Sequence, residues 1–144
     1  MDDNQHIQLH ATVVAWAGNG VLVVGSSGSG KSALALQLMA HGCDLVTDDR
    51  TDLLRENDQL IASAPQSIQG QIEARGFGIL QAPFVKKAVI VCAVDLNQTE
   101  QKRLPERKTK EYLGVTLALF HKTDMGVLPF AVLQYLKGAT RLPV

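Results

Sequence analysis

A glycine-rich stretch carries the most specific chemical pattern in the chain. Residues 25–32 read Gly-Ser-Ser-Gly-Ser-Gly-Lys-Ser and fit G-x-x-x-x-G-K-[ST]. Glycines let successive backbone N–H groups converge on an anion, and a helix N-terminus adds about half a positive charge. Lys31 is suited to reach nucleotide phosphates and Ser32 to bind Mg²⁺. The pattern therefore favours a phosphate-binding loop over a chance Gly/Ser-rich turn. The binding residues would be Gly25, Ser26, Ser27, Gly28, Ser29, Gly30, Lys31 and Ser32.

Two adjacent carboxylates follow soon after this stretch. Asp48 and Asp49 come directly after the apolar run 45–47. In that position one carboxylate is suited to lie near Mg²⁺ and the other to act as a general base. A turn that ends a strand also favours aspartate, and this is the alternative interpretation. The phosphate-binding pattern upstream favours the chemical one.

Further charged side chains lie on either side. Glu73 and Arg75 are two residues apart, which in a strand puts them on the same face as a metal ligand and a phosphate clamp, or as a surface ion pair. His10 is polar among apolar neighbours and is suited either to the phosphates or to a strand edge. Arg103 and Arg107 belong to a basic cluster that is either solvated or able to supply an arginine to a transferring phosphoryl group.

Composition restricts the class of protein. With 144 residues, of which 46% are hydrophobic, the chain has the length of one domain, expected over 1–144. Fourteen basic residues balance fourteen acidic ones, so nothing favours nucleic acid or an anionic membrane as partner. The polar N-terminus is unlike a signal peptide and no apolar run would span a bilayer, so we expect a soluble cytoplasmic protein. Cys43 and Cys92 have no zinc-type spacing and are expected to be reduced core residues.

The elements that must position these residues follow from apolar periodicity and turn residues. An antiparallel hairpin is expected to lead into the glycine-rich loop, which indicates a mixed sheet. We expect strands at 9–16, 21–24, 45–47, 53–55, 60–62, 88–94 and 115–120, an interrupted strand at 71–81, helices at 33–39 and 128–136, a frayed lead at 1–5 and a solvated loop at 96–111.

An ordered series of these motifs resembles the catalytic domain of HPr kinase/phosphorylase, which phosphorylates a serine of the phosphocarrier protein HPr. The series begins with His10-Ala11-Thr12 and the glycine-rich loop and ends with Leu113-Gly114-Val115; between them lie residues 45–49, 73–79 and 103–106. The resemblance implies an α/β fold of the P-loop, phosphoenolpyruvate carboxykinase-like type, a mixed β-sheet with flanking helices. It also implies ATP and Mg²⁺ as cofactors, an HPr-like protein as partner and a homo-oligomer, commonly a hexamer.

The resemblance also assigns roles. Lys31 would bind the nucleotide phosphates, Ser32 and Glu73 would hold Mg²⁺, and Asp49 would take the proton from the acceptor serine. His10, Arg75 and Arg103 would match other active-site positions. The nine residues before His10 resemble the short form found in alphaproteobacteria, or an isolated catalytic domain.

One segment departs from the family pattern. Residues 120–126 stand where the family has Pro-x-Arg-Pro-Gly-Arg, which leaves the phosphorolytic reverse reaction open. An ATP-sensing signalling module without phosphotransfer and a small-molecule kinase are alternatives. A small GTPase is a weaker one, because Lys122-Thr123-Asp124 resembles a guanine-reading motif while no convincing D-x-x-G switch is present.

Overall fold

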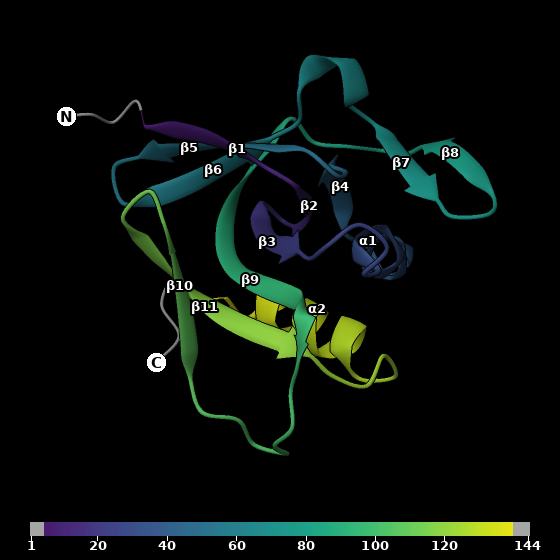
Figure 1. Ribbon diagram of the computed structural model, residues 1–144. Coiled ribbons are helices and arrows are strands. Elements are labelled where there is room, and N and C mark those ends of the chain that lie inside the picture. Colours follow the sequence, from purple (N-terminus) through teal and green to yellow (C-terminus); the bar gives the residue numbers. More distant parts are fainter. Residues whose placement is uncertain (1–4, 140–144) are drawn as a thin grey trace.

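The computed structural model describes residues 5–139, and strands dominate it. Nine strands form one large sheet, and two more form a separate hairpin that projects from the body (Figure 1). The strands are β1 (His6–Leu9), β2 (Ala11–Trp16), β3 (Asn19–Val24), β4 (Asp44–Thr47), β5 (Thr51–Glu56), β6 (Gln59–Ser63), β7 (Gln71–Ala74), β8 (Gly78–Gln81), β9 (Lys87–Thr99), β10 (Lys108–Tyr112) and β11 (Val115–Lys122). The helices are α1 (Lys31–Ala40), α2 (Leu128–Lys137) and a 3₁₀ turn at Gln66–Ile68.

Strand β9 organises the large sheet. It pairs in parallel with β3 and β11 and antiparallel with β6. The strand order is β1-β5-β6-β9-β3-β2-β4, and every pair of neighbours in it except β9–β3 is antiparallel. Because β3, β9 and β11 are parallel, their carboxyl ends lie at the same edge, where ligands of α/β proteins usually bind. The mixed sheet predicted from the sequence is confirmed.

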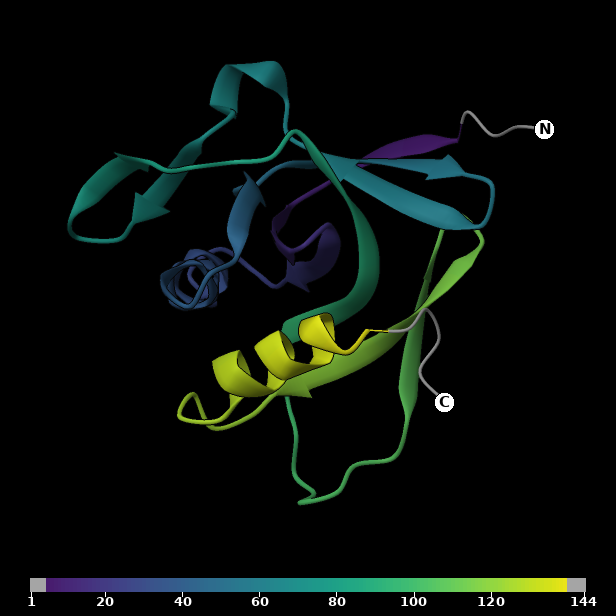
Figure 2. The same ribbon diagram turned by 180° about the vertical axis from the view of Figure 1, so that it is seen from behind.

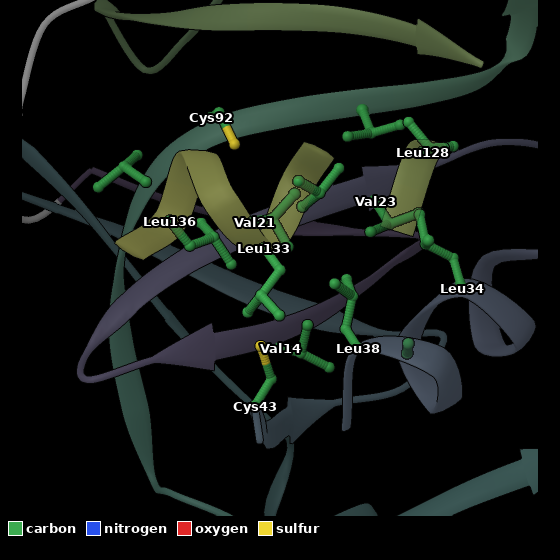
Figure 3. Packing of buried hydrophobic residues seen from close by; sticks show 14 of the residues in the cluster. Val14, Val21, Val23, Leu34, Leu38, Cys43, Cys92, Leu128, Leu133 and Leu136 are labelled. Atoms are coloured by element: carbon green, nitrogen blue, oxygen red, sulfur yellow. The ribbon is translucent and has the colours of Figure 1, made fainter. Parts of the chain in front are cut away.

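Both helices pack on one face of this sheet (Figure 2). Buried side chains of α1 and α2 meet strand residues there, and Figure 3 shows Leu34 and Leu38 beside Val14 and Val23. The other face has a second core made of strand residues, among them Leu22, Leu53 and Leu60. Within residues 5–139, no helix has the length and apolar character needed to cross a membrane.

Three of the expected elements have different bounds. The strand expected at 9–16 is divided at His10, because the chain leaves β5 as its neighbour and joins β3 and β4. The segment 71–81 is a hairpin rather than one interrupted strand: Gly76 has a φ of +81°, and the Phe77 N–H donates to the Ala74 carbonyl at 2.8 Å. The loop expected at 96–111 shrinks to residues 100–107, since β9 continues to Thr99 and β10 begins at Lys108.

The shorter loop has a physical cause. The end of β9 and most of β10 carry exposed polar side chains, so neither shows the apolar pattern of a buried strand. Their backbone pairing with β11 holds them in the sheet instead. The remaining expected strands and both helices are present within a few residues of their predicted ends, whereas residues 1–4 of the expected lead lie outside the described range.

The two cysteines are buried free thiols, as predicted. Burial raises the pKa of Cys92 to about 12, and burial, with the nearby Asp44 carboxylate, raises that of Cys43 to about 11. Since the thiolate is the reactive form, we expect both thiols to react with Ellman's reagent at pH 8 far more slowly in the native protein than in 6 M guanidinium. Equal rates in the two conditions would contradict the burial of these side chains.

Candidate active site

The glycine-rich loop joins the end of β3 to α1 at the carboxyl edge of the sheet (Figure 1). Gly28 and Gly30 have φ values of +84° and +106°, which side chains rarely tolerate. Lys31 is the first helical residue and is only 6% exposed, since its ammonium group bends back over the loop. Its Nζ donates to the Gly25 carbonyl at 3.1 Å. The predicted order of strand, loop and helix is therefore present, with a cation held at the helix N-terminus.

Asp48 ties four elements together directly beside this loop. Its Oδ1 accepts hydrogen bonds from the Ser32 hydroxyl at 2.6 Å and from the Thr12 hydroxyl at 2.9 Å. Its Oδ2 accepts one from the Glu73 backbone N–H at 3.0 Å. The side chain is buried, with a residue exposure of 8%. One carboxylate thus connects β4, β2, the first turn of α1 and β7.

Asp49 lies beside it but faces outward. Its φ is +71°, an uncommon conformation for a residue with a side chain, and such strain often accompanies function. The backbone is held there because the Asp49 N–H donates to the Thr12 hydroxyl at 3.0 Å and its carbonyl accepts from the Ala11 N–H at 3.1 Å. The side chain contacts His10, with Nε2 and Oδ1 2.7 Å apart. An accessible carboxylate oriented by an imidazole is suited to accept a proton.

The projecting hairpin closes the other side of the site. Arg75 lies in its turn, beyond the end of β7, and not on the strand face expected from the sequence. A Cβ placed on Gly28 would be 3.6 Å from both terminal nitrogens of the Arg75 guanidinium, so this cation approaches the glycine-rich loop. A cavity of about 320 Å³ lies between them, and Lys31, Asp49 and Glu73 also line it.

Arg103 lies elsewhere. It lines a separate cavity of about 540 Å³, formed by the 100–108 segment, β11 and α2. The carboxyl end of β9 nevertheless connects to the glycine-rich loop, since the Ser26 N–H and hydroxyl both donate to Asn97 Oδ1 at 3.0 Å. The structure therefore brings the expected site residues together around the loop, except for Arg103 and Arg107, which line the separate cavity. His10 and Asp48 belong to this group through their contacts with Asp49, Ser32 and Glu73.

The side chains at this site that are suited to hold a metal ion offer oxygen rather than nitrogen or sulfur as the ligand atom. Within residues 5–139 no three His, Cys, Asp or Glu side chains lie close enough to hold a metal ion by themselves. Magnesium commonly uses only one or two carboxylates, with substrate phosphates and waters completing its octahedron. Ser32, Asp48 and the Glu73 carboxylate therefore form a donor set of the right chemical kind for it.

Comparison with known proteins places the chain in a family. Residues 4–117 match the family model described as HPr Serine kinase C-terminal domain. The chain belongs to this family. Its sequence is 35% identical over 134 residues to the HPr kinase/phosphorylase of Halalkalibacterium halodurans, covering 84% of this chain and 42% of that protein. It is 44% identical over 107 residues to the HPr kinase/phosphorylase 1 of Oceanobacillus iheyensis, covering 69% of this chain and 34% of that protein.

A solved structure supports the same assignment to the HPr serine kinase C-terminal domain family. The Hpr(Ser) kinase/phosphatase from Coxiella burnetii superposes with a TM-score of 0.76 at 26% identity, covering 91% of this chain and 94% of that one. The chain spans less than half of the length of the two curated relatives named above.

Two connecting residues of this domain were not predicted to have a part in the site. Thr12 is fully buried and links Asp48 to the Asp49 backbone, and Asn97 holds Ser26. A polar residue inside the apolar run 11–15 is a usable signal for the first. Nothing in the sequence near Asn97 indicates its contact with a loop seventy residues earlier.

Proposed function

We propose that this domain transfers the γ-phosphoryl group of ATP to a serine hydroxyl of an HPr-like phosphocarrier protein. The observation that carries the proposal is the arrangement around the 320 Å³ cavity: a glycine-rich loop with its lysine, an arginine opposite, and an accessible carboxylate between them. Membership of the HPr serine kinase C-terminal domain family supports HPr as the acceptor.

Each side chain has a distinct task in this proposal. The backbone N–H groups of the loop and the N-terminus of α1 bind the phosphates, and Lys31 leaves the Gly25 carbonyl to pair with them. Arg75, which already approaches Gly28, stabilises charge on the transferring group. Mg²⁺, held by Ser32 and Glu73 with Asp48 nearby, would neutralise phosphate charge when bound.

Asp49 is the proton acceptor. As the serine oxygen forms its bond to the γ-phosphorus, the bond from that phosphorus to the β–γ bridging oxygen breaks and ADP leaves. The hydroxyl proton passes to the Asp49 carboxylate, which His10 orients through the 2.7 Å contact. The same groups in reverse would support attack by inorganic phosphate on phosphoserine.

The assembly and the remaining arginine follow the family resemblance. The proposed assembly is a homo-oligomer, commonly a hexamer in the family. In such an assembly Arg103 either lies near a reacting group of another copy or takes no part in the chemistry. Because Arg103 lines a different cavity from Lys31 in one chain, its catalytic assignment depends on such an assembly.

Incubation with labelled ATP, Mg²⁺ and the HPr of the same organism tests the proposal, followed by mapping of any phosphoserine. We expect label on one serine of HPr, lost on omitting Mg²⁺, and competition by ADP but not GDP. Lys31→Met is the matched inactive control.

A signalling module that binds ATP without transferring phosphate is the second candidate. The different segment at 120–126 favours it, since the family's two arginines there are absent. ATP binding without labelling of HPr would support this candidate and overturn the kinase proposal. A strong preference for GTP would overturn both.

A further inference from the structure

The 540 Å³ cavity lies apart from the candidate active site and is the larger of the two. One wall is a stripe on α2, where Ala131 and Tyr135 follow the residue before the helix, Val127, at intervals of four and so share one helical face. Phe120 on β11 also lines the cavity and packs edge-to-face on Tyr135, with ring centroids 5.2 Å apart. The volume of the cavity is in the range of pockets that bind small molecules.

The mouth of this cavity is basic. The 100–108 segment crosses it and carries four cationic side chains and two glutamates. Lys102 pairs with Glu106 at 3.1 Å, and Lys108 pairs with Glu100 at 2.7 Å. Among residues 5–139 no carboxylate pairs with the remaining two, Arg103 and Arg107. Two exposed guanidinium groups at this mouth therefore have no neutralising carboxylate among the described residues.

A polar group also lies inside the apolar part. The Tyr135 hydroxyl is buried and has no hydrogen-bond partner among the described residues, which is costly unless something else supplies one. Burial, followed by the nearby Cys92, raises the pKa of Tyr135, and the Arg107 guanidinium opposes that shift.

We propose that this cavity binds a small apolar molecule that carries one anionic head group. The apolar body lies against Phe120, Val127 and Ala131, and the head group pairs with Arg107 or Arg103 at the mouth. A strongly polar anion such as a free sugar phosphate fits poorly, because Val127, Leu128 and Ala131 would leave its hydroxyls without partners. The inference stands independently of phosphoryl transfer at the glycine-rich loop.

Binding of 1-anilinonaphthalene-8-sulfonate, an aromatic probe with one fixed negative charge, tests this site. The expected result is saturable binding to one site, weakened at least tenfold by Ala131→Leu, which fills the cavity from an exposed helix position. Gln134→Leu makes a similar change on α2 outside the cavity and is expected to leave the affinity unchanged. Circular dichroism checks that both variants fold.

The charge is tested separately. Arg107→Gln, at an exposed loop position, is expected to weaken the probe at least threefold and to lower its salt dependence. Decanoate is expected to displace the probe at a concentration at least tenfold below that of decanol. No binding to the wild type, an affinity in Ala131→Leu within threefold of wild type, or equal displacement by decanoate and decanol would overturn the proposal.

Discussion

Asp49→Asn is expected to slow phosphoryl transfer to a serine acceptor by about 10²–10⁴-fold, the usual contribution of a general base. The amide cannot take the hydroxyl proton, although it keeps the size of the carboxylate and can still accept a hydrogen bond from His10. Nucleotide affinity should change little, because the phosphates are bound by the loop and Lys31. Single-turnover transfer from labelled ATP, with ATP affinity measured in parallel, separates these two quantities.

Asparagine is the informative replacement because of the backbone at this position. The φ of +71° is tolerated by Asn far better than by Ala, so an Ala variant would mix lost chemistry with backbone strain. Asp52→Asn is a matched control: Asp52 accepts from Gln8 across the β1–β5 pair and does not line the cavity. Transfer by Asp49→Asn within tenfold of wild type would show that another group removes the proton.

The helices and most strands were predictable because their signals are local. The run Val21–Val24, the glycine-rich loop and the helix formers after it lie within twenty residues of one another, so pattern alone places Lys31 at a helix N-terminus. The hairpin before the loop was predictable for the same reason. These elements also position the most specific part of the candidate site.

The connections inside the site were not predictable from one sequence. His10 lies in a bend because β1 pairs with β5, about forty residues further along the chain, whereas β2 pairs with β3 and β4. Arg75 lies in a turn because Gly76 adopts a positive φ and allows the chain to reverse within a segment that also reads as a strand. Arg103 was grouped with the site by its basic cluster and by the family resemblance, and neither signal shows that it lines a different cavity, next to α2.

Asp48, which the sequence suggests as a metal ligand, also has a structural part. Both of its carboxylate oxygens already accept hydrogen bonds from protein groups, two from hydroxyls and one from the Glu73 N–H. A carboxylate held in this way acts first as a link between α1 and the projecting hairpin. A two-stranded hairpin has little stability of its own, so the position of Glu73 and Arg75 depends on this link.

Asp48→Asn is therefore expected to destabilise the protein by about 1.5–3 kcal/mol without any metal or nucleotide, the range for a hydrogen bond to a charged group. Hydroxyl donors can rotate to meet an amide oxygen, but the Glu73 N–H is fixed and would face an amide N–H₂. Urea unfolding in EDTA measures the loss, and faster amide exchange at β7 locates it.

Thr12→Val supplies the control that separates structure from metal binding. It keeps the shape of a fully buried side chain but removes the hydroxyl shared by Asp48 and the Asp49 N–H. Because the two residues share a bond, their effects on the free energy of unfolding should be non-additive in the double variant. If Asp48 were mainly a metal ligand, Asp48→Asn would instead keep its stability in EDTA, lose Mg²⁺-dependent activity and add independently to Thr12→Val.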